Sequence, residues 1–446
     1  MTYSQLLPVT HHFYPLQHCT DPTVEPFSGF MNDLQREKAN PSENLIYLHI
    51  PYCEKRCIFC PFHVRVKRDA EIYERYVRAV EREMELLAAL PYVQGMRFNA
   101  VYFGGGSPSM LSVPLVRRLY DGLRRHFRID DGAEWTFEGE PHSLSDPDLL
   151  AYLAGEGTTR LSYGIQTFDA ELREILNIAA SVDDVLRCSD LARAHGFKEV
   201  NVDMMFYLPG QEAEDLDRDI AELARHGFDS VDYYYMSYFG LPQKAFDDME
   251  KGLFPKRPPE AARFTMNRQV REGMRAAGFH NVTDHVFSRT ETGSDYYRLL
   301  WGGGHGRHDA ETLAIGASAR GYIAGYGYAN DVAHNAYIAR VERGELPLFK
   351  VSDRLRDPRN RGVAFFPKFF AIPEADVPDD GRTMDVLEML IEGGLARRAD
   401  GVIALTDEGK DWIPNITVDL FESEQRAIND RWVHELNSRH SNRVTL

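Results

Sequence analysis

The run Tyr47-Leu-His-Ile-Pro-Tyr-Cys-Glu-Lys-Arg-Cys-Ile-Phe-Cys60 places three cysteines directly after an apolar, strand-like segment. Cys53, Cys57 and Cys60 have the spacing C-x3-C-x2-C. A 4Fe-4S cluster takes four ligands, so three thiolates from one loop would leave one iron open to another molecule. We therefore predict a 4Fe-4S cluster with Cys53, Cys57 and Cys60 as its metal ligands. We expect the function to depend on the iron that no cysteine binds.

Two other uses of the cysteines remain open on spacing alone. A zinc site would need a fourth Cys or a His nearby, and His63 follows the last cysteine closely. A disulfide framework is disfavoured, because 5 cysteines in 446 residues is far below the density of small secreted folds. Cys19 and Cys188 have no partner at ligand spacing, and we interpret them as ordinary thiols. Phe59 inside the loop is unlike a small zinc module, which favours the iron-sulfur cluster.

Three further motifs follow the cysteine loop in chain order. They are Val101-Tyr-Phe-Gly-Gly-Gly-Ser-Pro-Ser109, Arg160-Leu-Ser-Tyr-Gly-Ile-Gln-Thr-Phe168 and Val200-Asn-Val-Asp-Met-Met-Phe-Tyr-Leu-Pro-Gly210. Together with the cysteines, they resemble the radical S-adenosylmethionine (SAM) enzymes, and within them the branch typified by oxygen-independent coproporphyrinogen oxidase. A weaker similarity continues through Ala314-Ile-Gly-Ala-Ser-Ala-Arg-Gly321 into the tail at 405–409.

Short apolar runs alternate with amphipathic stretches through the middle of the chain. The predicted strands are 45–50, 98–103, 134–138, 160–164, 199–203 and 231–236, and the stretches between them include predicted helices at 71–90 and 113–127. This alternation predicts an α/β fold with parallel strands and crossover helices. The family resemblance implies a partial (β/α)6 barrel with a lateral opening for substrate. We expect the chemistry to gather where the strands end.

Three regions follow from changes in pattern along the chain. Residues 1–43 have little periodicity and several prolines, which predicts an N-terminal arm. We predict that 44–345 form the radical SAM partial barrel and its extension. Residues 346–446 are expected to form a smaller, mostly helical C-terminal domain with a small β-wing near 395–405.

The family resemblance implies binding sites for two SAM molecules. Tyr47, Gly105 and Glu138 match residues that contact the SAM on the cluster. The residues expected to line a second SAM site are Phe59, Gly106, Ser107, Gln166, Asp203 and Met236. Gln166 and Asp203 are polar residues within apolar strands, where they need hydrogen-bond partners, so ligand contact and an internal network both remain open.

The chain departs from the family pattern at two places. Ile178 stands where an arginine is usual, which would loosen or reorient a second SAM. The residues 61–64 after the last cysteine match neither the oxidases nor the haem chaperones. A glycine-rich stretch at 300–309 is also distinctive, and we predict that His305 or His308 acts there as a catalytic proton acceptor. The alternative is a surface loop.

From these features we expect a class C radical SAM enzyme. Such an enzyme would use two SAM molecules and a 5'-deoxyadenosyl radical to transfer a methylene or methyl unit to an sp2 carbon, giving methylation or cyclopropanation. The expected substrate is a small aromatic or conjugated natural product, since aromatic residues gather at 233–235 and 365–370, although these could equally be core packing. Coproporphyrinogen oxidase activity, by oxidative decarboxylation, and haem chaperoning remain the alternatives.

Composition limits the partners of the chain. A formal net charge of −17 argues against binding nucleic acid, which calls for a basic surface. No apolar stretch approaches the roughly 18 residues of a membrane span, and the first residues do not read as a signal peptide. We therefore expect a cytoplasmic protein with no membrane partner, reduced by a donor such as flavodoxin or ferredoxin.

Overall fold

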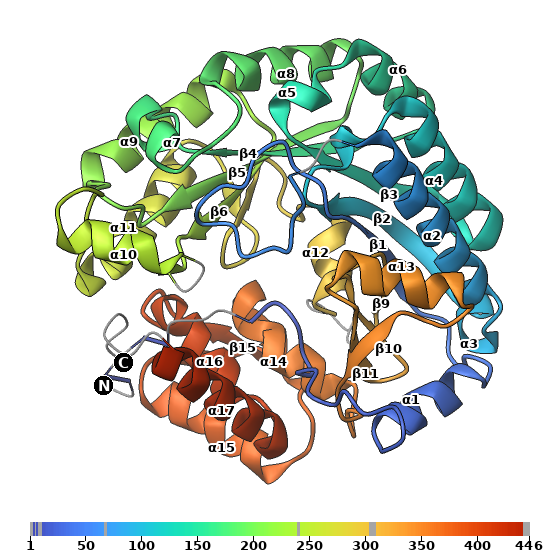
Figure 1. Cartoon of the computed structure of the whole chain (residues 1–446). Coiled ribbons are helices and arrows are strands. Elements are labelled where there is room, and N and C mark those ends of the chain that lie inside the picture. Colours follow the sequence, from blue (N-terminus) through green and yellow to red (C-terminus); the bar gives the residue numbers. More distant parts are fainter. Residues whose placement is uncertain are drawn as a thin grey trace.

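The computed structural model describes residues 3–4, 6–7, 11–66, 69–238, 241–302 and 309–439. Six parallel strands form the curved middle of a large sheet (Figure 1). They are β1 (Glu43–Ile50), β2 (Arg97–Gly105), β3 (Ile129–Gly139), β4 (Arg160–Gln166), β5 (Glu199–Phe206) and β6 (Ser230–Tyr235). The chain visits them in spatial order, so each one pairs with the next.

Additional strands extend the sheet beyond both sides of this middle. Beside β6 lies β8 (Val286–Ser288), antiparallel to it, and β7 (His280–Asn281) pairs antiparallel with β8 at the edge of the sheet. Beside β1 lies β9 (Glu311–Ile315), which is parallel to it. The antiparallel strands β10 (Arg320–Ile323), β11 (Tyr326–Asn330) and β12 (Leu348–Val351) follow β9. In the described residues the sheet therefore has 12 strands, in the order β12-β11-β10-β9-β1-β2-β3-β4-β5-β6-β8-β7.

Helices cover the convex face of the sheet, as Figure 1 shows. The long ones are α2 (Ala70–Ala88), α4 (Val113–His126), α6 (Pro147–Gly155), α8 (Val182–Ala194), α9 (Ala213–His226) and α11 (Glu260–Ala276). Shorter ones are α1 (Phe27–Leu34), α3 (Pro91–Gln94), α5 (Pro141–Leu144), α7 (Ala170–Ile175), α10 (Gln243–Glu250), α12 (Asp295–Leu300) and α13 (His334–Glu342). Among these, α12 packs on the inner side, against β1, β2 and β9.

The two faces of β1 show why this sheet forms. Ile46, Leu48 and Ile50 are fully buried in the core beneath the helices. Leu45 and Tyr47 belong to a second apolar cluster, with residues of α12. A strand covered on both faces reads as a nearly continuous apolar run. The inner face is also where polar side chains enter the barrel.

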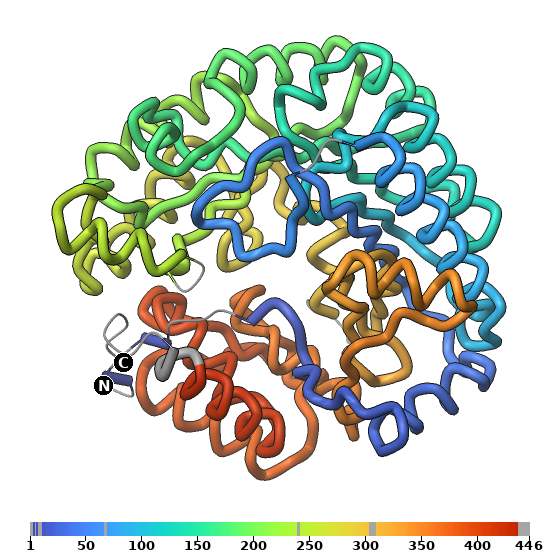
Figure 2. The backbone as a smooth tube through the Cα atoms, in the orientation of Figure 1, coloured from blue at the N-terminus to red at the C-terminus, as the bar shows by residue number. Residues whose placement is uncertain are grey.

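The C-terminal part of the chain is mostly helical. It contains α14 (Arg359–Phe369), α15 (Gly381–Glu392), α16 (Ile413–Asp419) and α17 (Ser423–Arg439). A three-stranded sheet of β13 (Ala371–Pro373), β15 (Val402–Leu405) and β14 (Ala396–Ala399) forms the predicted β-wing. The start of the chain lies beside these helices (Figure 2), where Tyr14 stacks on Phe421 at 4.5 Å between ring centroids.

The predicted fold class is confirmed, and each of the six predicted strands is present. The sheet is wider than a six-stranded barrel, because the later strands continue it on both sides. Strand β12 belongs to this sheet, so the sheet passes the expected boundary at residue 345. The division into three domains stays a prediction.

Candidate active site

The cysteine loop leaves β1 at the carboxyl end of the sheet and closes on itself. Cys53 N–H donates to Arg65 O (3.1 Å), and Arg65 N–H donates to Pro51 O (2.7 Å). The middle of the loop is fixed from outside, since Ile58 N–H donates to Leu176 O (3.2 Å) just after α7. The loop is therefore tied both to β1 and to the segment between α7 and α8.

The three thiols fit an iron-sulfur cluster. Cys53, Cys57 and Cys60 are half-buried and none forms a disulfide. Burial raises the pKa of Cys53 and Cys57 to about 12, and the nearby Glu140 carboxylate and neighbouring thiols add to the shift. Thiolates in this place therefore need positive charge close to them, which bound iron supplies.

The described residues argue against a single metal ion. Within them, no three His, Cys, Asp or Glu side chains converge as ligands of one ion would. A 4Fe-4S cluster does not need that convergence, because each cysteine binds a different iron. The donor set thus fits the predicted cluster better than the alternative zinc site with His63.

The glycine motif lies beside the cysteine loop, at the end of β2. Gly105 has φ of +112°, a conformation that favours glycine, and its N–H donates to Glu138 Oε2 (3.3 Å). A Cβ on Gly106 would lie 2.6 Å from Tyr52 O. Ser107 Oγ is 3.8 Å from Cys53 Sγ. The turn therefore needs glycine so that β2 can approach the backbone entering the cysteine loop.

Glu138 supplies a carboxyl group beside this glycine turn. It ends β3, and burial raises the pKa of its carboxyl to about 7, while the hydrogen bond from Gly105 N–H acts in the opposite direction. Tyr47 lies on the neighbouring β1, where its ring stacks on Tyr102 with 5.9 Å between centroids. The residues expected to hold one SAM molecule, Tyr47, Gly105 and Glu138, thus come from three adjacent strands.

His49 belongs to the same corner, and the sequence reasoning missed it. It is 3% exposed, and its Nδ1 lies 3.2 Å from Tyr47 Oη. The ring fills the space over Gly105, where an added Cβ would approach it to 2.5 Å. The period-two alternation of β1, which puts residues 47 and 49 on one face, is a signal that could have found it.

Gln166 ends β4, and Asp203 lies in the middle of the neighbouring β5. Gln166 has a positive φ of 71°, which is uncommon for a residue with a side chain. Burial, together with the Asp232 carboxylate on β6, raises the pKa of Asp203 well above its usual value. Neither side chain has a hydrogen-bond partner among the described residues. Ligand contact therefore stays a prediction for both.

The remaining predicted residues stand as follows. Phe59 is half-buried and packs against the main core. Met236 is 1% exposed and belongs to that core, so its contact with a second SAM stays a prediction. Ile178 also packs there. His305 and His308 lie outside the described residues, and their catalytic role stays a prediction.

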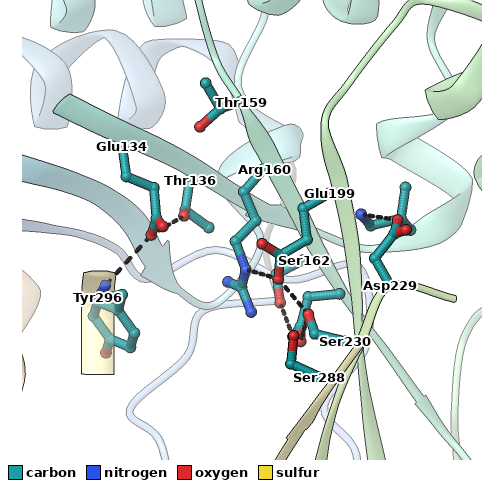
Figure 3. Close-up of polar contacts among 12 residues, drawn as sticks. Glu134, Thr136, Thr159, Arg160, Ser162, Glu199, Asp229, Ser230, Ser288 and Tyr296 are labelled. Atoms are coloured by element: carbon teal, nitrogen blue, oxygen red, sulfur yellow. Dashed lines mark hydrogen bonds and ion pairs between the residues drawn. The ribbon is translucent and has the colours of Figure 1, made fainter. Parts of the chain in front are cut away.

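Below the strand ends, the barrel interior holds a buried arginine (Figure 3). Arg160 is 2% exposed, and its Nε donates to Glu199 Oε1 (2.9 Å). Burial opposes its charge, yet Glu199 and Asp232 hold the Arg160 pKa well above its usual value. Glu134, drawn in the same view, accepts from the backbone N–H of Asp295 (2.9 Å) and so caps α12.

Tyrosines of α12 and β6 add hydrogen bonds to this buried network. Tyr297 Oη donates to Asp232 Oδ2 (2.6 Å), and Tyr297 Oη and Tyr234 Oη are 2.9 Å apart. Tyr296 stacks on Tyr102 at 4.0 Å between centroids. The helix thus fills the inside of the sheet with aromatic rings and keeps Asp232 of β6, which is 2% exposed, away from bulk water.

Comparison with known families identifies the kind of domain in which these motifs lie. The radical SAM superfamily model matches residues 47–223, which start at Tyr47 and include the cysteine loop and the three later motifs. Residues 47–223 therefore match a radical SAM domain. The cofactors implied by this match are a 4Fe-4S cluster and SAM, as predicted. None of the described helices is long and apolar enough to cross a lipid bilayer.

Two relatives and one solved structure are similar to this chain over most of its length. It is 29% identical to anaerobilin synthase of Escherichia coli O157:H7, over 87% of this chain and 86% of that protein. It is 27% identical to the heme chaperone HemW of Bacillus subtilis, over 82% and 95%. The solved structure of coproporphyrinogen III oxidase (HemN) from Escherichia coli has a TM-score of 0.75 at 22% identity, over 88% and 93%. This last likeness shows the fold.

These comparisons overturn the expected reaction. The relatives over most of the chain are named for anaerobilin and heme, and none of the three is named for methyl or cyclopropane transfer. The prediction of a class C methylase or cyclopropanase is therefore wrong. Its motifs did predict the radical SAM match over residues 47–223, because the features that they are expected to serve, a cluster and SAM, are common to many reactions.

Proposed function

We propose that the protein is a radical SAM enzyme that acts on a tetrapyrrole, with heme as the first substrate to test. The supporting observation is the similarity along more than four-fifths of the chain to anaerobilin synthase and a heme chaperone. Both names refer to tetrapyrroles, whereas the fold alone would permit many substrates. The cysteine loop and the Gly105–Glu138 corner favour an enzyme over a chaperone that only binds.

The proposed chemistry divides between cofactors and protein. A 4Fe-4S cluster would supply the electron that splits SAM into methionine and a 5'-deoxyadenosyl radical. Cys53, Cys57 and Cys60 would hold the cluster. Gly105 and Glu138 would orient the amino end of SAM, where a carboxylate attracts the ammonium group. The tyrosines of α12 would exclude water from the reacting centre.

Two polar side chains lie on the neighbouring strands β4 and β5, Gln166 at the end of β4 and Asp203 in the middle of β5. Burial and the Asp232 carboxylate raise the pKa of Asp203 well above its usual value. We propose that a second SAM molecule binds there, with Gly106 and Ser107 on its other side. The half-buried, unpaired side chains of Gln166 and Asp203 support this proposal. Equilibrium dialysis of the reconstituted protein against radiolabelled SAM would give two molecules per chain, and one would contradict it.

Turnover under anaerobic conditions tests the main proposal. The reconstituted protein, reduced and supplied with SAM, is incubated with heme or with coproporphyrinogen III. We expect 5'-deoxyadenosine formation that depends on heme, together with loss of heme. The Cys53→Ala, Cys57→Ala, Cys60→Ala triple variant should form none. If neither tetrapyrrole stimulates SAM cleavage, the proposal is wrong.

Coproporphyrinogen oxidation is the second candidate, and release of carbon dioxide would identify it. For either substrate we propose an electron donor such as flavodoxin or ferredoxin as the physiological partner. Half-buried free thiols around an iron-sulfur cluster favour a reducing cytoplasm as the place of the reaction.

A further inference from the structure

The segment that carries the three cysteines has a charge opposite to that of the whole chain. Residues 53–68 contain five Lys or Arg and one Glu, which gives this stretch a net charge of +4, whereas the whole chain has −17. The five cations are Lys55, Arg56, Arg65, Lys67 and Arg68. Because salt screens the more distant acids of the surface, a local basic segment can attract and orient an acidic partner.

Two of these cations lie at the surface, between the first two cysteines. Lys55 and Arg56 are exposed, and neither forms an ion pair within the described residues. Arg56 directly precedes Cys57, so its charge is carried beside one of the proposed cluster ligands. Both cations are therefore available to a molecule that approaches the cysteine loop from solvent.

The same loop exposes apolar side chains. Phe62 is 52% exposed and Val66 is 46% exposed, and both follow the last cysteine closely. Single exposed apolar residues are normal on a protein surface. Among the described residues, however, this loop is the place where two large exposed apolar side chains lie close together in the sequence. We call Lys55, Arg56, Phe62 and Val66 the loop patch. An apolar centre beside arginine is typical of protein interfaces.

The loop patch is ordered before any partner binds. On its inner side the loop is fixed to the end of α7, since Ile58 N–H donates to Leu176 O (3.2 Å) and Asn177 Nδ2 donates to Arg56 O (2.9 Å). Figure 2 shows the loop in blue, with no other segment in front of it. A surface that is already held in place loses little conformational entropy when a partner docks.

The position of the loop patch identifies the class of its partner. A protein that docks on the loop carrying Cys53, Cys57 and Cys60 brings its own redox centre close to the proposed cluster. We propose that the loop patch is the docking site of a small acidic one-electron carrier protein of the flavodoxin or ferredoxin class. One electron leaves the reduced carrier and enters the cluster. Electron-transfer complexes have small interfaces, so a patch of this size suffices. This inference rests on the proposed function, which needs a reduced cluster for each cleavage of SAM.

Binding in the absence of turnover tests the docking site. The cluster-loaded protein is titrated calorimetrically, at low ionic strength, with an oxidised flavodoxin and with an oxidised ferredoxin. The double variant Lys55→Gln, Arg56→Gln should bind its carrier about tenfold more weakly than wild type, and added salt should reduce this difference. Phe62→Ser should weaken binding at least about fivefold. The matched controls are Lys251→Gln and Leu253→Ser, two exposed residues after α10, and both should bind as wild type does.

The choice of reductant separates docking from support of the cluster. Dithionite is a small ion that needs no docking surface. With heme and dithionite, the double variant should therefore form 5'-deoxyadenosine at the wild-type rate, whereas with the reduced carrier it should be several-fold slower. Equal loss with both reductants, or a fall in iron content, would show that the loop supports the cluster and would overturn the docking site.

The remaining outcomes also decide the proposal. Wild type that binds neither carrier, or variants that bind their carrier as wild type does, would overturn it. Loss of heme affinity in the double variant with unchanged carrier binding would assign the loop patch to the carboxylates of a tetrapyrrole, and would overturn it as well. If wild type with dithionite cleaves no SAM in the presence of either tetrapyrrole, the proposed function is wrong, and the carrier titrations still report on the docking site.

Discussion

The Glu138 carboxyl group accepts a hydrogen bond from Gly105 N–H in a place withdrawn from bulk water. Its raised pKa, about 7, means that the acid is largely charged above pH 7 and increasingly neutral below it. At the proposed SAM site, this single residue would therefore set the pH range in which the amino end of SAM is held. Gly106 nearby is equally restrictive, because backbone atoms of Tyr52 and Ile50, and not flexible side chains, occupy the space beside it.

SAM affinity should depend on the charge of Glu138. As pH falls below 7, protonation removes the attraction for the ammonium of SAM, so affinity should drop by up to about tenfold per pH unit. It should fall again above roughly pH 8, where the amino group of SAM loses its proton. Glu138→Gln should bind SAM weakly, and its affinity should not fall further as the pH drops below 7. Calorimetric titrations at pH 6, 7 and 8 measure this, and an unchanged acid limb in the variant would contradict the SAM contact.

Gly106→Ala should impair cluster loading. The new Cβ would lie 2.6 Å from Tyr52 O and 3.0 Å from Ile50 O, and these backbone atoms can move only if the entry to the cysteine loop moves with them. Gly132→Ala is the matched control, since nothing lies within 4 Å of its added Cβ. Iron and sulfide content after reconstitution should fall in the first variant only.

At the scale of elements, helix α2 is joined to the far side of the sheet by one carboxylate. Glu83 accepts from Gly316 N–H (2.8 Å), Asn330 Nδ2 (2.7 Å) and Tyr337 Oη (2.5 Å). These donors come from the turn after β9, from β11 and from α13. Glu83 is 1% exposed, so no water molecule can take the place of its carboxylate as the acceptor for these donors.

Glu83→Gln should lower the free energy of unfolding by about 1–3 kcal/mol, because the amide places a donor against donors and leaves at least one unpaired. Glu85→Gln on the same helix removes only an exposed pair with Arg82 and should change stability by less than about 0.5 kcal/mol. Urea unfolding followed by circular dichroism distinguishes the two. Equal midpoints would show that the three hydrogen bonds contribute little.

The elements that could be predicted from sequence are those with a strong local pattern. Strands β1 to β6 were found because each is an apolar run between helical stretches, and the cysteine and glycine motifs marked the ends of two of them. Strands β9 to β12 were missed, since short antiparallel strands leave a weak pattern and β9 pairs with a strand far earlier in the chain. The buried ion pair between Lys368 and Asp284 had no local signal, because its two residues lie 84 positions apart in the sequence.

At the scale of the whole molecule, the start of the chain connects the barrel to the C-terminal helices. Leu16 N–H donates to Gln425 Oε1 (2.6 Å), and Tyr14, 2% exposed, accepts from Glu422 N–H (3.1 Å). Cys19 forms a β-bridge with Val351 of β12. The arm therefore packs against the C-terminal helices at one point and the edge of the large sheet at another.

Tyr14→Ala should destabilise this connection by about 3–5 kcal/mol, the usual cost of removing a large buried ring. Amide hydrogen exchange in α16 and α17 should become faster, while exchange in β2 to β5 stays unchanged. Phe13→Ala, which removes a half-buried ring from the same arm, is the control and should change exchange less. Uniform acceleration across the chain would show that the arm supports the barrel as well.

The position of β1 in the sheet also bears on how the protein is made. Asn44 Oδ1 accepts from Glu311 N–H, 267 residues later, so one side of the cysteine strand stays unpaired until β9 has left the ribosome. At about 5–20 residues per second, synthesis of the intervening chain takes on the order of ten seconds or more. The nascent cysteine loop therefore emerges long before its support is complete. We therefore expect iron delivery to this protein to follow translation.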